Sequence, residues 1–253
     1  MIGEFFQYFD SSRPSIKAGE WPLSDEFKQY HRAPTIQLPV PQSLKKISLP
    51  QVLQERASAE NFSSKPLALS DLGSLLYWSA GLIHRSAIVN LSEAARRKNL
   101  VRRPHPSGGG RFPIELYAVL FRGQDVDPGA YHYNVVRHCL ERLPKASLAT
   151  IATAFAGHTE LISDAPAVIF LSFVSHRTIP KYGSLGLKLG LLEGGHIGQN
   201  LYLVGTALGL AVLATGTVDY EIAHYELGLD GEEETLFYQF LMGYSKTKKS
   251  VDR

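Results

Sequence analysis

Apolar positions along the chain predict a mixture of strands and helices. The continuously apolar run at 167–174 is typical of a strand buried on both faces of a sheet. Shorter apolar runs predict strands at 114–121, 130–133 and 236–242. Helices are predicted at 48–59 with Pro50 near the first turn, at 70–81 with Ser70 and Asp71 as the cap, around 92–98, at 147–156 and at 185–210. This order of elements predicts an α+β or α/β sandwich.

The first 45 residues have a different character from the rest. They are rich in proline and aromatic residues, so we expect little regular structure there. Such an arm can wrap the body of the protein, wrap a partner subunit, or stay partly disordered. We therefore divide the chain into an arm at 1–45 and a domain at 46–253.

The predicted helix at 185–210 carries a glycine at every fourth position. Gly186, Gly190, Gly194 and Gly198 form one ridge on its surface. A ridge without side chains lets a backbone or a flat ligand approach closely. We expect this helix to be central and to pack on a symmetry mate.

The same helix also carries polar residues on one face, namely Glu193, His196, Gln199 and Asn200. If buried, they need partners, so they form either a satisfied core network or a polar floor under a cofactor. Zinc is disfavoured, because the face has a single histidine and no cysteine nearby. The polar residues also argue against a transmembrane helix.

Composition narrows the class further. The chain has 253 residues, of which 44% are hydrophobic, so it can bury a full core. A net charge of +2 predicts neither nucleic acid nor membrane as a partner. Cys139 is the single cysteine, which excludes an intramolecular disulfide and a multi-cysteine metal site; no metal is expected. The first residues do not form a secretory signal, so we expect a cytoplasmic protein.

The segment 103–117, RPHPSGGGRFPIELY, is the strongest chemical signal. Three consecutive glycines offer no side chain to pack, but they expose backbone N–H groups beside Arg103 and Arg111. That combination suits an anion or an electron-rich ring edge. Taken alone, however, a glycine triplet is more often a flexible loop with solvated arginines. The spacing fits neither a P-loop nor a dinucleotide fingerprint.

Taken together, the motifs resemble those of the nitroreductase superfamily of FMN flavoproteins, and within it the SagB-type dehydrogenases, which include azoline oxidases. The resemblance runs through most of the chain. It rests on YHRAP at 30–34 followed by LPVP, R-x-S-x-x-x-F at 56–62, SDLGSLLYWSAGL at 70–82, R-x-x-PSGG and P-x-E-x-Y within 103–117, GAYHY at 129–133, HCLE at 138–141, KYG at 181–183 and LLEGGHIGQNL at 191–201.

The resemblance implies an α+β sandwich with a central, mostly antiparallel sheet and an intimate homodimer. It implies two FMN molecules at the dimer interface and a ping-pong exchange of two electrons. Position by position, the implied cofactor-binding residues are Arg56 and Ser58 at the phosphate and ribityl end, Ser107, Gly108 and Gly109 against the isoalloxazine, Arg103 and Pro106 facing the cofactor, Gln199 and Asn200 near the flavin, and Thr215 and Gly216 at the N5 edge. Lys248 in the basic tail is a further implied phosphate contact, although a solvated tail is the favoured alternative there.

Lys181 and Tyr182 match the pair that azoline oxidases use in catalysis. Dehydrogenating an azoline removes a C–H proton, so a base within hydrogen-bond reach is needed. A lysine can serve if desolvation or a cation such as Arg177 lowers its pKa. Without the resemblance, an exposed lysine beside a packed tyrosine is the favoured explanation of the pair.

Two positions depart from the family pattern. Glu60 stands where a cation usually lies near the flavin, and 186–188 lacks the arginines that usually follow KYG. The first puts the flavin environment in question, and the second puts substrate anchoring in question. The chain also has no room for a separate peptide-clamp domain, so a peptide substrate would need a partner protein.

The resemblance favours FMN-dependent dehydrogenation of an azoline-like heterocycle in a peptide or small natural product. Two other functions stay open. One is an NAD(P)H-dependent nitro or quinone reductase. The other is a flavin-free scaffold in a biosynthetic complex, which Glu60 would suit.

Overall fold

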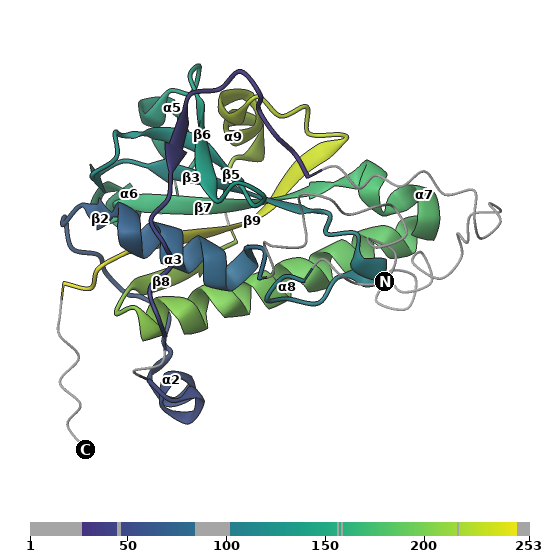
Figure 1. The fold of residues 1–253 in the computed structure, drawn as a ribbon. Coiled ribbons are helices and arrows are strands. Elements are labelled where there is room, and N and C mark those ends of the chain that lie inside the picture. The colour runs from purple at the N-terminus through teal and green to yellow at the C-terminus, as the bar shows by residue number, and fades with distance from the viewer. Residues whose placement is uncertain are drawn as a thin grey trace.

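A seven-stranded sheet forms the centre of the molecule (Figure 1). The computed structural model describes residues 27–44, 47–83, 102–155, 157, 159–216 and 218–246. In the order β1-β6-β5-β3-β7-β9-β8, every neighbouring pair is antiparallel. The strands are β1 (Thr35–Gln37), β3 (Ile114–Leu120), β5 (Gly129–Asn134), β6 (Cys139–Leu143), β7 (Ala167–Val174), β8 (Ala211–Thr215) and β9 (Glu234–Gly243). A small parallel pair joins β2 (Leu67–Ala68) to β4 (Gly123–Gln124).

Helices cover both faces of this sheet. On one face lie α3 (Leu69–Ala80) and α8 (Ser184–Ala207), and on the other lie α5 (Leu148–Thr153), α6 (Thr159–Asp164) and α9 (Tyr220–Leu227). The helix α2 (Leu49–Glu55) stands below α8 in Figure 1. Three short turns complete the described elements: η2 (Gly108–Gly110), η4 (Ser175–Arg177) and α7 (Ile179–Tyr182). The expected α+β class with a mostly antiparallel sheet is confirmed.

The strand β7 lies at the centre of the sheet, and all eight of its residues are buried. Its side chains alternate between the two layers, as the pleat requires. Ile169 and Leu171 join the core under α3 and α8, whereas Val168 and Phe170 join the core under α5 and α9. The prediction for 167–174 is therefore confirmed at both ends.

The glycine ridge of α8 faces the chain's own sheet, so its assignment to a symmetry mate was wrong. A Cβ added at Gly190 would lie 2.4 Å from the Phe173 ring, and one at Gly194 would lie 2.4 Å from the Phe237 ring. The glycines are the holes into which aromatic rings of the sheet insert. Because of them, the helix can lie close to the sheet.

Several predicted boundaries were also wrong. The long helix ends at Ala207, because Gly209 takes a left-handed φ of 73° and turns the chain into β8. Ser70 and Asp71 do not cap α3, since the cap position is Ala68. The helix predicted at 48–59 ends at Glu55. The helix predicted at 92–98 lies outside the described residues.

No helix in the described part of the chain has both the length and the apolar character needed to cross a bilayer.

Candidate functional site

The glycine loop is a compact, internally bonded turn. Gly109 and Gly110 both have a φ of 65°, the left-handed region in which a side chain is costly. Ser107 closes the turn from both sides. Its carbonyl accepts a hydrogen bond from the Gly110 N–H at 3.0 Å, and its Oγ accepts one from the Phe112 N–H at 2.8 Å. The loop is therefore a fixed shelf of backbone and is not a flexible linker.

This shelf lies directly against the predicted catalytic pair. A Cβ added at Gly109 would lie 2.3 Å from the Tyr182 Oη and 3.3 Å from the Lys181 Nζ. One at Gly108 would lie 2.9 Å from the Leu189 Cδ1 on α8. Both members of the pair are partly exposed, and the Lys181 Nζ lies 4.9 Å from the centre of the Tyr182 ring. A side chain at Gly109 would displace the ends of both side chains and would strain the backbone at its φ of 65°.

Two arginines tie the glycine loop to the segment that carries Lys181. The buried Arg177 donates to the Phe112 carbonyl at 2.9 Å and forms an ion pair with Glu115 at 2.5 Å. In the opposite direction, Arg111 donates to the Arg177 carbonyl at 3.0 Å. Phe112 itself has a φ of 47°, a strained value for a residue with a side chain. The cross-links hold this strain in place.

Behind Arg177 lies a buried chain of charges that the sequence interpretation missed. His132 lies between two carboxylates, 3.0 Å from Glu115 and 2.8 Å from Glu141. Burial opposes ionisation of these groups. Nevertheless, Arg177 and His132 hold the pKa of Glu115 well below its usual value, and the two carboxylates raise the pKa of His132. Alternation along β3, β5 and β6 could have placed these three side chains on one face of the sheet.

A second group of predicted residues lies around Tyr202, further along α8. The Ser58 Oγ is 3.1 Å from the Tyr202 Oη, and the Arg56 guanidinium lies 5.6 Å from the centre of its ring. The Tyr202 Oη also accepts a hydrogen bond from the Ala214 N–H on β8 at 2.8 Å. Arg56 is partly exposed and Ser58 is exposed, so a ligand can reach both side chains.

Thr215 and Gly216 follow at the end of β8. Thr215 is buried, and both its carbonyl and its hydroxyl accept from the side-chain amide of Gln239, at 2.5 and 2.9 Å. Gly216 is exposed, and no atom would lie within 4 Å of an added Cβ. Of the two, Gly216 therefore has the accessible backbone. Glu60, the departure from the family pattern, is exposed.

Arg103 and Asn200 bind the last carbonyls of α3. The Arg103 Nε donates to Ala80 O at 2.6 Å, and the Asn200 Nδ2 donates to Ser79 O at 3.1 Å. These carbonyls are the unpaired groups that any helix end leaves, so both side chains serve as C-terminal caps. Burial lowers the pKa of Arg103, and no described residue pairs with its Nη2. That atom is a donor available for a further acceptor.

The polar face predicted on α8 is split. Glu193 is buried, and its Oε1 lies 3.2 Å from the His105 Nε2. His196 and Gln199 are exposed, and Asn200 is partly exposed. The four residues therefore do not form one core network. Gln199 remains accessible to a ligand.

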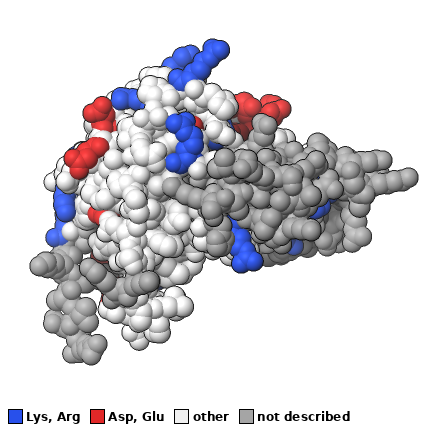
Figure 2. Space-filling view, in the orientation of Figure 1, with Lys and Arg blue, Asp and Glu red and all other residues white. Residues whose placement is uncertain are grey.

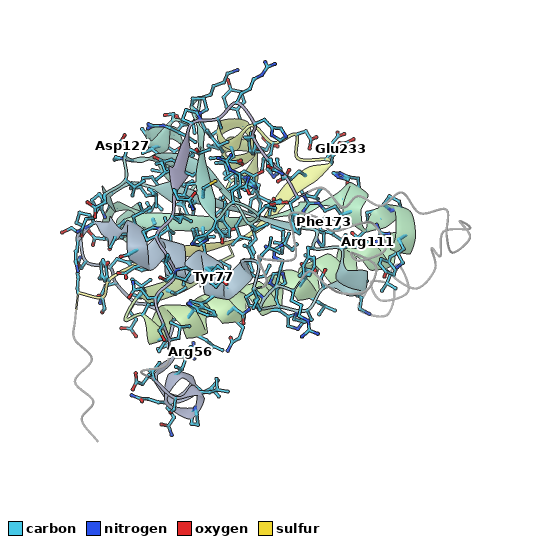
Figure 3. The ribbon with its side chains drawn as sticks, in the orientation of Figure 1. Arg56, Tyr77, Arg111, Asp127, Phe173 and Glu233 are labelled. Atoms are coloured by element: carbon cyan, nitrogen blue, oxygen red, sulfur yellow. The ribbon has the colours of Figure 1, made fainter. Side chains whose placement is uncertain are left out.

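The predicted site residues thus form two groups at different points along α8. Leu189 marks the glycine-loop group and Tyr202 marks the Arg56 group, and 13 helical residues separate them by about 20 Å. In Figure 3, Arg111 lies beside α7 while Arg56 lies near α2. Lys248 lies outside the described residues.

The residues present suit a flat, anionic cofactor. A glycine shelf can accept a ring face, the free Arg103 donor can bind a ring acceptor, and Arg56 with Ser58 can bind a phosphate. One chain alone holds these features apart, at two ends of one helix.

Known proteins resemble this chain in sequence and in fold. The Nitroreductase family model matches residues 53–244. "Putative nitroreductase MJ1384" of Methanocaldococcus jannaschii is 29% identical over 72% of this chain and 83% of its own length. The microcin B17-processing protein McbC of Escherichia coli is 26% identical over 44% of this chain and 42% of its own length.

Solved structures share the fold. A chain of the E. coli microcin synthetase McbBCD complex, with truncated pro-MccB17 bound, has a TM-score of 0.66 at 19% identity. The match covers 97% of this chain and 92% of that chain. A "putative nitroreductase" from Desulfovibrio desulfuricans in complex with FMN has a TM-score of 0.52 at 14% identity over 82% of this chain and 92% of that chain. Since the family model spans most of the chain, the protein belongs to the nitroreductase family of oxidoreductases.

Proposed function

We propose that this protein is an FMN-dependent dehydrogenase that oxidises an azoline-like heterocycle in a peptide or natural-product intermediate. The observation that carries the proposal is the contact between the glycine shelf and the Lys181–Tyr182 pair. A substrate ring lying over this shelf would have a basic nitrogen and a phenol beside it. Dehydrogenation of a C–H bond needs such a base.

Bound FMN would supply the two-electron acceptor for this oxidation. Arg56 and Ser58 would bind its phosphate and ribityl end, and Gly108, Gly109 and the Arg103 Nη2 would face the ring. Lys181 would take the proton from the substrate carbon, and Tyr182 would orient Lys181 or the substrate. Arg177 and Arg111 would keep the base at a fixed position relative to the shelf.

We propose a homodimer in which the two groups of residues meet across the interface. If the α8 helices of two subunits pack side by side in opposite directions across a two-fold axis, the Arg56 group of one subunit would lie beside the glycine loop of the other. Exposed leucines on α2 and α8 support an interface on this side. They are Leu49, Leu53, Leu191 and Leu192, exposed by 64, 53, 41 and 55%.

The relatives support a peptide as the substrate class. McbC is a microcin B17-processing protein, and the McbBCD complex was solved with a truncated precursor peptide bound. By analogy, a peptide substrate of this chain would be delivered by a partner protein. The main competing function is an NAD(P)H-driven nitro or quinone reductase, which the larger match to the M. jannaschii relative favours.

The two functions are separated by one set of measurements on the purified protein. The proposal expects FMN to be released on heating, and expects an azoline-containing peptide to reduce the bound flavin without added NAD(P)H. Reduction by NAD(P)H followed by rapid turnover of quinones would establish the reductase instead. A protein that takes up no FMN would refute both functions.

A further inference from the structure

A pocket lies on the face of the sheet that α5 and α9 cover, away from the glycine loop and Arg56. Three segments line its volume of about 500 Å³: residues 30–34, residues 142–145 and residues 225–228 at the end of α9. Leu143 and Leu227 belong to the core under α5 and α9, and Tyr30 packs against it, whereas the glycine loop and Arg56 adjoin α8. A pocket of this volume is large enough for a ligand or a peptide side chain.

Hydrogen bonds between the lining segments fix the walls of this pocket. The Arg142 N–H donates to Pro34 O at 2.8 Å, and the Tyr30 N–H donates to a Glu141 oxygen at 3.0 Å. On the α9 side, a carboxylate oxygen of Glu226 accepts from the Ser147 N–H at 2.6 Å. The pocket is therefore built before any ligand arrives, which lowers the entropy cost of binding.

The chemistry of the pocket is apolar inside and cationic at the mouth. Among the lining residues, Arg32 and Lys145 are exposed, and Arg142 is partly exposed with Asp127 3.6 Å away. Tyr225 is 83% exposed beside them. Glu226 is the one acidic lining residue, and it is buried and already bonded. Figure 2 shows basic side chains at the top of the molecule, where Figure 1 places β1, β6 and α9, with acidic side chains to the left and right of them.

We propose that this pocket is a docking site for an acidic peptide segment, which inserts an apolar side chain between Tyr30, Leu143 and Leu227 and pairs its carboxylates with the cationic mouth. The cations lie at the exposed rim and none is buried inside. A small anion would instead need donors that converge on one point. An amphipathic peptide matches both the apolar interior and the charged rim.

The edge strand β1 supports a peptide as the occupant. The bonds from Arg142 N to Pro34 O and from Leu38 N to His138 O show that the backbone groups of the even-numbered residues at 34–38 point toward β6. The N–H and C=O groups of Thr35 and Gln37 therefore point to the open side of the strand, along which no described strand lies. An extended segment leaving the pocket next to Pro34 can pair with them.

The test is binding of a labelled peptide to the full-length protein, followed by fluorescence anisotropy. The probe carries a central Phe-Leu pair flanked on both sides by Asp and Glu. We expect Arg32→Glu combined with Lys145→Glu to weaken binding by about tenfold or more, since two attractive charges become repulsive. Tyr225→Ala, an exposed position that leaves the core intact, should weaken binding as well. Lys65→Glu is the matched control and should bind as wild type, because this exposed cation lies over the Tyr244 ring and belongs neither to the lining segments nor to β1 or β6.

The peptide's own chemistry gives the second arm. Replacing its acidic residues with lysine, or its Phe-Leu pair with Gly-Ser, should each abolish binding. Equal binding of the acidic and lysine peptides, unchanged affinity in the Arg32/Lys145 double variant, or no binding at all would overturn the proposal. Binding of phosphatidylserine vesicles in preference to the peptide, lost in the same double variant, would also overturn it and would assign the rim to a membrane. None of these readouts depends on the flavin or on catalysis.

Discussion

Lys181 and Arg56 are both partly exposed cations, yet the structure predicts different consequences when each is removed. Lys181 lies against the glycine shelf, whereas Arg56 lies beside Tyr202. Lys181→Ala should keep FMN but lose turnover by about 10²–10⁴-fold, the usual contribution of a positioned base. Arg56→Ala should instead release FMN, because a phosphate partner is gone. Flavin absorbance after gel filtration and single-turnover rates measure the two effects.

Tyr182→Phe is the matched control for this contrast. It removes only the hydroxyl that contacts Gly109, so its loss of turnover should be smaller than that of Lys181→Ala. If Lys181→Ala oxidised the substrate at the wild-type rate, Lys181 would not be the base. Family membership would then support an oxidoreductase without this mechanism.

The buried charges around His132 make stability depend on pH from both sides. The pKa of Glu115 is far below its value of 4.5 in the unfolded chain, so its contribution is present above that pH and is lost as the pH falls. The pKa of His132 is raised above 6.5, so its contribution is complete below that pH and is lost as the pH rises through the raised value. Urea unfolding across the pH range should therefore show the largest free energy of unfolding between the acid loss of the Glu115 contribution and the alkaline loss of the His132 contribution.

Glu115→Gln tests this origin directly. The substitution leaves the Arg177 guanidinium buried without its carboxylate partner. We expect the free energy of unfolding at neutral pH to fall by about 3 kcal/mol, and its loss on acidification to become shallower. An unchanged acid limb would show that other carboxylates control the acid sensitivity.

At the scale of elements, the sequence pattern predicted best the strand that is buried on both faces. The strand β7 was predicted at both ends because burial on both faces leaves an unbroken apolar run. The strand β8 was missed. The helix prediction ran to residue 210, directly before β8, and only Gly209 marks the turn between the two elements. The helix α9 has an Asp219 cap and a left-handed Gly228 at its end, two signals that were present in the sequence but not used.

The candidate site was predictable to a different degree. Local motifs identified Gly109 and the Lys181–Tyr182 pair as candidate site residues, and the fold places them in contact. The ion pair between Arg177 and Glu115 joins residues 62 positions apart through the pairing of β3 with β7, which a linear pattern does not encode. Likewise, the burial of Glu193 and the exposure of His196 depend on how α8 is rotated over the sheet.

The packing of α8 on the sheet gives a prediction at this scale. Gly190→Ala would place a methyl group 2.4 Å from the buried Phe173 ring, and the ring or the helix would have to move. We expect the free energy of unfolding to fall by about 1–3 kcal/mol, as overpacked cores show. Gly195→Ala is the control on the same helix. It meets no atom within 4 Å and should be neutral or stabilising. Thermal or urea unfolding of both variants, at the same oligomeric state, measures the difference.

For the whole molecule, the separation of the two residue groups by about 20 Å along α8 is the central constraint. The glycine loop with Lys181 and the Arg56–Ser58 group both have the chemistry of a flavin site, yet neither is complete alone. In the homodimer proposed above, each of the two sites would take one group from each subunit. The exposed leucines of α2 and α8 would then be covered.

This arrangement predicts that two inactive variants can complement each other. In a mixed dimer of Arg56→Ala and Lys181→Ala subunits, one shared site carries both substitutions and the other carries neither. Unfolding and refolding an equal mixture should therefore restore about a quarter of the wild-type turnover, since about half of the dimers are mixed and each has one intact site. Refolding either variant alone controls for recovery and should restore nothing. If both groups served the same site within one subunit, every site in the mixture would carry one substitution, and the mixture would stay as inactive as its components.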